Sequence, residues 1–390
     1  GHMINYPLAS STWDDLEYKA IQSVLDSKMF TMGEYVKQYE TQFAKTFGSK
    51  YAVMVSSGST ANLLMIAALF FTKKPRLKKG DEIIVPAVSW STTYYPLQQY
   101  GLRVKFVDID INTLNIDIES LKEAVTDSTK AILTVNLLGN PNNFDEINKI
   151  IGGRDIILLE DNCESMGATF NNKCAGTFGL MGTFSSFYNK HIATMEGGCI
   201  VTDDEEIYHI LLCIRAHGWT RNLPKKNKVT GVKSDDQFEE SFKFVLPGYN
   251  VRPLEMSGAI GIEQLKKLPR FISVRRKNAE YFLDKFKDHP YLDVQQETGE
   301  SSWFGFSFII KKDSGVIRKQ LVENLNSAGI ECRPIVTGNF LKNTDVLKYF
   351  DYTVHNNVDN AEYLDKNGLF VGNHQIELFD EIDYLREVLK

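Results

Sequence analysis

The sequence is poor in cysteine and has no cysteine pattern that would bind a metal. Its five cysteines are odd in number and widely spaced, with no CxxC pair: Cys163, Cys174, Cys199, Cys213 and Cys332. Such a set predicts reduced thiols, a cytoplasmic location and no metal site. We interpret Cys163 as a packing residue, because no adjacent histidine or helix start would activate its thiol.

Other signals are missing as well. No apolar run approaches the roughly 20 residues that span a bilayer, so we expect no membrane segment. The N-terminus lacks the apolar stretch of a secretory signal. A net charge of −6 argues against general binding to nucleic acid or to membrane surfaces. The chain has no phosphate-binding GK[ST] motif and no GxGxxG fingerprint, which disfavours a nicotinamide-dependent sugar reductase.

The sequence does contain a long alternation of short apolar runs and helical patterns. Strands are predicted at 51–55, 81–86, 104–107, 130–135, 155–160, 182–187 and 198–202, with helices at 61–71 and 204–217. Alternation of this kind predicts an α/β fold, with a mostly parallel mixed sheet covered by helices on both faces.

The pattern changes after about Arg252. Helical patterns over 254–268, 272–287 and 316–328 accompany strand-like runs at 302–310 and 331–334. They predict a smaller α+β domain. For a chain of 390 residues, we expect a large domain with the N-terminal segment over residues 1–263 and a small C-terminal domain over 264–390.

A lysine and an aspartate carry the most specific chemical signal. Lys190 follows a run of serine and aromatic residues and precedes a glycine pair, while Asp161 ends an apolar strand. A carboxylate there would hold a pyridine nitrogen protonated, and a lysine amine would form a Schiff base and move protons. The two residues predict a pyridoxal phosphate (PLP) site in which both are catalytic. Taken alone, Lys190 would be a solvated loop lysine and Asp161 a helix cap.

Further parts of such a site follow in order. The turn Ser57-Gly58-Ser59-Thr60 would direct backbone N–H groups at a phosphate, or would be a plain helix cap. Trp90 would stack on a flat ring, or would belong to a core or an interface. Glu164 would reach a ring hydroxyl, and Ser185 would add a hydroxyl to the phosphate.

Two segments leave alternatives open. His191 is an alternative base, although neighbouring side chains on an extended segment point apart. The turn from Pro247 to Arg252 would be a plain loop or part of a site shared with a second subunit. Lys225 and Lys226, in a lysine-rich loop, would hold a diphosphate or would be solvated.

These parts, in this order, resemble the DegT/DnrJ/StrS family of PLP-dependent sugar aminotransferases, which have the aspartate aminotransferase fold (fold type I). The resemblance runs from about Tyr35 to the C-terminus. The segments that carry it are Gly58-Ser59, Pro86 with Trp90, Phe106 to Asp110, Gly139-Asn-Pro141, Glu160-Asp161, Ser185 to Gly198 and Gly248 to Arg252.

The resemblance implies how the cofactor phosphate is bound. The backbone amides of Gly58 and Ser59, together with Ser185, would hold it. Asn250 would reach the phosphate in the partner subunit's site, which implies a homodimer with shared active sites.

The resemblance also implies how the cofactor ring is held. Trp90 would stack on the ring, Asp161 would pair with its nitrogen, and Glu164 would lie near its hydroxyl, where relatives often carry glutamine. Lys190 would bind the cofactor covalently. The family uses PLP and pyridoxamine phosphate in turn, with glutamate as amino donor and 2-oxoglutarate as its product.

Two segments narrow the resemblance within the family. Residues 188–198 and the run Ala216-His217-Gly-Trp-Thr-Arg221 are similar to the 3-dehydratase branch. This branch removes the C3 hydroxyl of GDP-4-keto-6-deoxy-D-mannose in the biosynthesis of colitose, a sugar of lipopolysaccharide O-antigens. We expect His217 and Arg221, within the second of these segments, to contact the substrate or the cofactor.

The catalytic position departs from that branch. The branch carries a histidine where this chain has Lys190, and the pair Asn189-Lys190 is the aminotransferase form. We interpret the chain as a dehydratase scaffold with a replaced catalytic residue. The start Gly1-His2-Met3 is typical of a cleaved affinity tag and favours deliberate replacement over natural variation.

We therefore expect Lys190 to permit an internal aldimine and transamination at sugar C4. One alternative is a native 4-aminotransferase similar to perosamine synthases. Another is a non-catalytic protein of this fold that binds a nucleotide sugar.

Overall fold

The computed structural model describes residues 3–390, so that Gly1 and His2 of the predicted tag remnant lie outside the described residues. Its centre is an eight-stranded sheet with the order β1-β9-β8-β5-β4-β2-β3-β14. Neighbours from β8 through to β14 run parallel, whereas β9 is antiparallel to both β1 and β8. The strands are β1 (Tyr51–Val55), β2 (Glu82–Pro86), β3 (Arg103–Val107), β4 (Thr129–Val135), β5 (Ile157–Asp161), β8 (Met181–Ser185), β9 (Gly198–Thr202) and β14 (Asp351–Val354).

Helices cover both faces of this sheet, as the sequence predicts. Successive residues of β1 show the division, because Val53 packs with one hydrophobic cluster and Met54 with another. The first cluster holds α3 (Gly58–Ala68), α4 (Ser91–Gln99) and α7 (Glu205–Ile214) against the sheet. The opposite face packs against α2 (Glu34–Phe47), α5 (Ile118–Ala124), α6 (Phe144–Ile151) and the first half of α9 (Glu255–Phe286).

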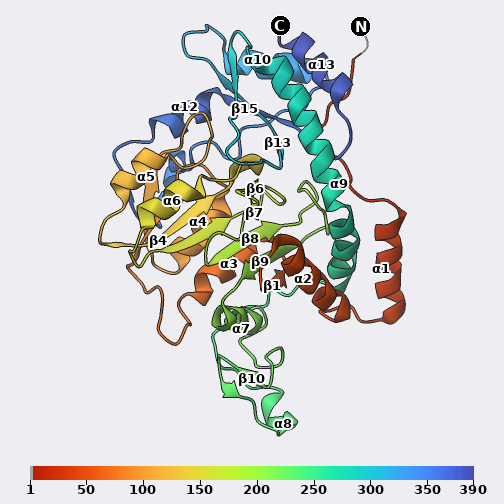
Figure 1. The fold of residues 1–390 in the computed structure, drawn as a ribbon, viewed down its shortest axis with the longest axis vertical. Coiled ribbons are helices and arrows are strands. Elements are labelled where there is room, and N and C mark those ends of the chain that lie inside the picture. Colours follow the sequence, from red (N-terminus) through yellow and green to blue (C-terminus); the bar gives the residue numbers. More distant parts are fainter. Residues whose placement is uncertain (1–2) are drawn as a thin grey trace.

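A second, smaller sheet lies at the far end of α9. It has the antiparallel order β12-β13-β15, and its aromatic core includes Phe282 of α9 stacked on Phe306 of β13. The elements of this part are β12 (Leu292–Val294), β13 (Gly305–Ile310), β15 (Gly368–Gly372), α10 (Arg318–Ser327), α12 (Asp359–Asn367) and α13 (Phe379–Val388). Figure 1 shows α9 running from the side of α2 up to α10 and α13.

The structure corrects two predicted elements. The helices expected at 254–268 and 272–287 are one helix, α9, because Pro269 lies inside it without ending it. The strand expected at 331–334 is a single bridge between Arg333 and Phe370. The domain division at 263/264 remains a prediction. Helix α9 crosses that point, and β14 from the C-terminal part joins the large sheet.

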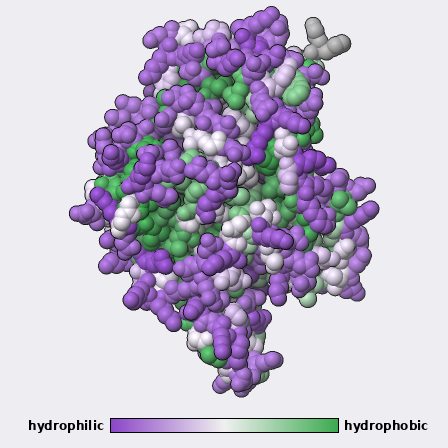
Figure 2. Space-filling view, viewed as in Figure 1, coloured by the Kyte–Doolittle hydropathy of each residue, from purple (hydrophilic) through white to green (hydrophobic). Residues whose placement is uncertain are grey.

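The remaining elements are peripheral. An arm built from β10 (Lys226–Asn227), β11 (Gly231–Val232) and α8 (Gln237–Glu240) extends beyond α7, at the bottom of Figure 1. Short elements complete the fold: α1 (Asp15–Ser27), β6 (Thr169–Phe170), β7 (Lys173–Cys174) and α11 (Thr344–Leu347). Figure 2 shows a mainly hydrophilic face with hydrophobic residues gathered across its middle. Within residues 3–390, no helix has both the length and the hydrophobicity to cross a membrane.

Candidate active site

A cavity of about 310 Å³ lies where several parallel strands of the large sheet end. Asp161 at the end of β5 and Ser185 at the end of β8 both line it. Ligands of open α/β sheets bind at this carboxyl edge. The structure brings most of the predicted site residues together in its lining: Gly58, Ser59, Trp90, Asp161, Glu164, Ser185 and Lys190.

One end of the cavity is the N-terminus of α3. Ser57 caps this helix, its hydroxyl accepting a hydrogen bond from the Thr60 N–H at 3.0 Å. The N–H groups of Gly58 and Ser59 are left without a partner inside the helix. They lie at the positive end of the helix dipole, beside the hydroxyls of Ser59 and Ser185 in the same lining. This end of the pocket can therefore bind a phosphate.

Glycine is required where backbones meet at this end. A Cβ on Gly58 would lie 2.8 Å from the Ser185 Cβ, and one on Gly198 would lie 2.1 Å from the Ser57 carbonyl oxygen. The glycine that follows the Lys190 loop thus lets β9 start directly against the Ser57 turn. This contact explains why the glycine pair and the phosphate-binding turn occur together in the sequence.

The other end of the cavity holds the buried carboxylate of Asp161. Its Oδ2 accepts hydrogen bonds from Thr93 Oγ1 at 2.6 Å and from Asn62 Nδ2 at 3.0 Å. Its Oδ1 accepts from the Cys163 N–H at 3.1 Å. These three hydrogen bonds fix the direction of the carboxylate. Asp161 is therefore suited to hold a protonated ring nitrogen.

The neighbouring carboxylate, Glu160, has a structural function. Successive residues of a strand point to opposite faces, so Glu160 faces away from Asp161. It is fully buried and accepts hydrogen bonds from the N–H groups of Gly176, Phe178 and Gly179 at 2.7–2.9 Å. Burial raises the pKa of Glu160, while these N–H groups act against that rise.

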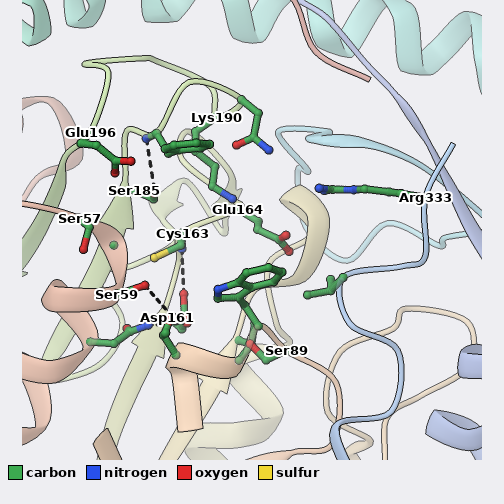
Figure 3. A pocket seen from close by; sticks show the side chains of 18 residues that line it. Ser57, Ser59, Ser89, Asp161, Cys163, Glu164, Ser185, Lys190, Glu196 and Arg333 are labelled. Carbon is green, nitrogen blue, oxygen red and sulfur yellow. Dashed lines mark hydrogen bonds between the residues drawn. The ribbon is translucent and has the colours of Figure 1, made fainter. Parts of the chain in front are cut away.

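Lys190 lies between these two ends. Figure 3 shows its amine pointing into the pocket, toward Glu164. Its Nζ is 4.9 Å from the centre of the Phe304 ring. Cys163 also lines the pocket, and burial, followed by the charge of Asp161, raises the pKa of its thiol well above the ordinary value. A thiol in this state is a poor nucleophile, which supports the interpretation of Cys163 as a packing residue.

His191 does not share the pocket with Lys190. The segment turns at this point, with the Lys190 N–H donating to the Phe187 carbonyl at 2.9 Å, and is not the extended segment that the sequence suggested. The imidazole of His191 is fully buried, and its Nε2 lies 2.9 Å from the Ser302 carbonyl oxygen. Burial and the charge of Arg275 hold its pKa well below the ordinary value. His191 therefore packs beneath the site as a neutral residue.

Three predicted residues lie outside this chain's own pocket. Asn250 is exposed and accepts a hydrogen bond from Arg252 Nε. Arg221 lies over the Trp219 ring at 3.9 Å, and His217 meets the same ring edge-on. All three stand near the base of the projecting arm. Their predicted roles in a partner's site or at the substrate remain predictions.

Several residues of the lining were not predicted from the sequence. Arg333 and Glu196 enter the cavity from opposite sides in Figure 3, and Asn62 and Thr93 hold Asp161. Arg333 comes after β12, β13 and helix α10, where the chain returns to the cavity. No motif in the neighbouring sequence marks Arg333 as a site residue. Asn62 and Thr93 lie near the starts of α3 and α4, and in the sequence they resemble ordinary helix residues.

The residues present fit pyridoxal phosphate. A helix N-terminus with hydroxyls stands at one end, a buried carboxylate at the other, and Trp90 and the Lys190 amine lie in the lining between them. The cofactor, once bound, would supply a ring that draws electrons from an attached amine carbon. The protein must hold that ring, keep its nitrogen protonated and move protons nearby.

Comparison with known proteins gives consistent matches. A GDP-4-keto-6-deoxy-D-mannose 3-dehydratase of Yersinia pseudotuberculosis is 73% identical over 388 residues, covering 100% of this chain and 99% of the relative. The structure of an E. coli GDP-4-keto-6-deoxy-D-mannose-3-dehydratase with bound hydrated PLP is 99% identical, with a TM-score of 0.99 and complete coverage of both chains. A variant of such a dehydratase, with a histidine replaced by asparagine and with bound GDP-perosamine, also matches at 99% identity and a TM-score of 0.99, over 99% of this chain and 100% of that chain.

The profile of the DegT/DnrJ/EryC1/StrS aminotransferase family matches residues 12–375. This range contains the whole pocket and every strand of both sheets. The fold, the pocket and the relatives agree, and the chain belongs to the DegT/DnrJ/EryC1/StrS aminotransferase family.

Proposed function

We propose that this protein is a PLP-dependent enzyme that acts on GDP-4-keto-6-deoxy-D-mannose and takes its amino group from glutamate. The observation that carries the proposal is a lysine amine and a buried, hydrogen-bonded carboxylate in one pocket with a helix N-terminus. The high identity to enzymes named for this sugar supports the choice of substrate. A protein that only binds nucleotide sugars would need neither Lys190 nor Asp161.

The donor would use the side of the pocket that holds Arg333. Arg333 lines the cavity and rests against the Phe370 ring at 4.7 Å. Among residues 3–390, the structure records no ion pair between its guanidinium and a carboxylate. A planar guanidinium matches a carboxylate in two parallel hydrogen bonds. Arg333 would therefore hold a carboxylate of glutamate while Lys190 moves the proton.

The outcome for the sugar would depend on residue 190. Lys190 would remove a proton at the cofactor carbon and return one to sugar C4, which gives a 4-amino sugar. A histidine at this position has no amine with which to recover the cofactor covalently, and loss of the C3 hydroxyl and release of ammonia would follow. We infer that Lys190 makes at least part of the turnover transamination.

We also propose a homodimer with shared sites in the cytoplasm. Large apolar side chains are exposed in the pocket lining, with Trp90 at 56% and Phe187 at 43%, and the next residue, Tyr188, is 48% exposed. Exposed apolar groups of this size commonly mark an interface. In such a dimer Asn250 would reach the partner's phosphate, and His217 and Arg221 the partner's substrate.

The proposal is tested with glutamate labelled in its amino nitrogen. Protein, PLP, labelled glutamate and GDP-4-keto-6-deoxy-D-mannose are incubated together. The products are then separated, and mass spectrometry shows which of them carries the label. We expect label in a 4-amino sugar for the chain with Lys190 and label in ammonia for Lys190→His, the matched variant. Label in ammonia alone for both proteins would contradict the role of Lys190, and absence of any turnover would contradict the proposed function.

Covalent attachment is tested separately. Borohydride reduction of the PLP-loaded protein, followed by peptide mapping, should place the cofactor on Lys190. A label on any other lysine would refute this assignment.

A further inference from the structure

The amine of Lys190 has no carboxylate bound to it. Across residues 3–390 the structure gives Lys190 no ion pair, and its closest recorded partner is the face of the Phe304 ring, 4.9 Å from Nζ to the ring centre. A cation over an aromatic face is attracted by the ring quadrupole within about 6 Å. The Phe304 ring, next to the pocket, thus offers this amine an uncharged partner that is not the cofactor.

The backbone on both sides of the Phe304 ring is firmly held. Its N–H donates to the Leu138 carbonyl at 3.2 Å, and its carbonyl accepts from Arg275 Nη1 at 3.0 Å. The ring is 5% exposed and stacks on Phe370, with centroids 5.8 Å apart. A ring held in this way can fix the position of the more flexible lysine.

Arg333, the other cation of the pocket lining, uses the same aromatic cluster. Its guanidinium lies 5.8 Å from the Phe304 ring and 4.7 Å from Phe370. Phe304 therefore contacts both cations that the proposed reaction uses, the lysine that would bind the cofactor and the arginine that would bind the donor.

We propose that Phe304 is a positioning residue that holds the amine of Lys190 beside the pocket while this amine is protonated and not bonded to the cofactor. The role rests on the proposed function, in which Lys190 is bonded to the cofactor and released in turn. During the released stage, the ammonium would otherwise be free to pair with Glu164, toward which it points in Figure 3, or with Asp161, and so to compete with the cofactor ring for the carboxylate that its nitrogen needs. The contact with Phe304 would hold it short of an ion pair with either carboxylate.

Other charged and titratable groups near this amine must be taken into account. From the end of β5 and the loop after it come Asp161, Cys163 and Glu164; from the lysine's own loop comes Glu196; from the opposite wall comes Arg333. Beneath the loop lie His191, which is held neutral, and Arg275. Of these groups, Arg333 contacts the rings of both Phe304 and Phe370, so a variant of Phe370 is needed to separate an effect through Arg333 from the effect of the Phe304 ring on Lys190.

The test measures Lys190 directly and does not depend on turnover. The full-length protein is saturated with pyridoxamine phosphate, which leaves Lys190 unbonded, and is modified with trace acetic anhydride across a pH series. Peptide mass spectrometry then gives the pH midpoint of Lys190 modification, with the exposed Lys19 as internal reference. In Phe304→Leu we expect a midpoint lower by roughly half a unit to one unit, the size of a partly desolvated cation–π contact.

Phe370→Leu is the matched control. It removes an aromatic ring from the same cluster, and the structure records no contact between that ring and Lys190. The midpoint in this variant should stay within about 0.2 units of the original protein. An unchanged midpoint in Phe304→Leu, or an equal fall in both variants, would overturn the proposal.

A second series covers the case in which Phe304→Leu does not fold. Site-specific replacement of Phe304 by phenylalanines of increasing fluorination keeps the shape of the ring and weakens its quadrupole. The midpoint should fall stepwise with fluorination, and a flat series would overturn the proposal. If borohydride reduction did not attach the cofactor to Lys190, the proposed function would be contradicted instead. The pH midpoints would still measure the effect of the Phe304 ring on the Lys190 amine.

Discussion

Replacement of Asp161 by asparagine gives a sharp test of the pocket's electrostatics. The substitution keeps the shape of the side chain and removes its charge, while Asn62, Thr93 and the Cys163 N–H still point at it. An opposite charge at about 4–6 Å shifts a pKa by roughly 1–3 units. The ring nitrogen of the bound cofactor would then lose ~1.4–4 kcal/mol of preference for its proton.

This loss enters the barrier of every step that needs the ring to accept electrons. Asp161→Asn should therefore slow the reaction with glutamate by roughly 10- to 1000-fold in single turnover, which is the rate equivalent of that free energy. The assay is the absorbance change of the PLP-loaded protein mixed with glutamate in a stopped-flow instrument. Cofactor occupancy is measured first, so that weaker binding is not read as a slower step.

Asp108→Asn is the matched control for this experiment. Asp108 also follows a parallel strand of the large sheet and is buried, and it accepts N–H groups of Asn360 and Ala361. It does not line the cavity. This variant should lose stability and keep its rate. A rate for Asp161→Asn within twofold of the original protein at full occupancy would refute the reasoning.

Two stability predictions follow from contacts elsewhere. Gly198→Ala places a Cβ 2.1 Å from the Ser57 carbonyl oxygen and should lower the free energy of unfolding in urea by roughly 1–3 kcal/mol or more. Gly153→Ala has open space around it and should change that free energy by under about 0.5 kcal/mol. Equal losses in the two variants would contradict the close approach at Gly198. Burial lowers the pKa of His374 to about 4, and its ring lies 2.7 Å from both the Pro7 carbonyl and Ser10 Oγ. Because the folded pKa is depressed, this stabilisation is complete above the unfolded pKa of ~6.5 and is lost as the pH falls toward 4. Between pH 6.5 and 4.5 the original protein should lose roughly 2–3 kcal/mol more than His374→Asn, measured by urea unfolding at each pH; parallel losses would exclude His374 as the source.

The sequence predicts the parts of the site that depend on local patterns. Gly58 and Ser59 follow a strand, Asp161 ends one, and Lys190 precedes a glycine pair, so each can be located from neighbouring residues alone. The parallel sheet then brings these strand ends to one edge, and the structure places the residues in a single cavity.

Other parts could not be predicted because they depend on distant segments. Arg333 reaches the pocket, and Phe304 reaches the amine of Lys190, only through the return of the C-terminal half of the chain, and nothing near them in the sequence marks a site. The predicted break in α9 was wrong because a proline costs one backbone hydrogen bond, and the packing of a 32-residue helix outweighs that cost. His191 points away from the pocket, as predicted, although the backbone turns at Lys190 where an extended segment was expected.

The adjacent acids at the end of β5 have a consequence for how the fold keeps its alignment. Glu160 accepts three main-chain N–H groups on one face of the strand, and Asp161 serves the cavity on the other. Sliding the strand by a single residue would exchange their faces and present the wrong acid to the cofactor. A buried carboxylate without its hydrogen-bond donors costs free energy, and such a shift would leave both Glu160 and Asp161 without theirs. The hydrogen bonds of Glu160 thus fix the register of β5 and so keep the side chain of Asp161 facing the cavity.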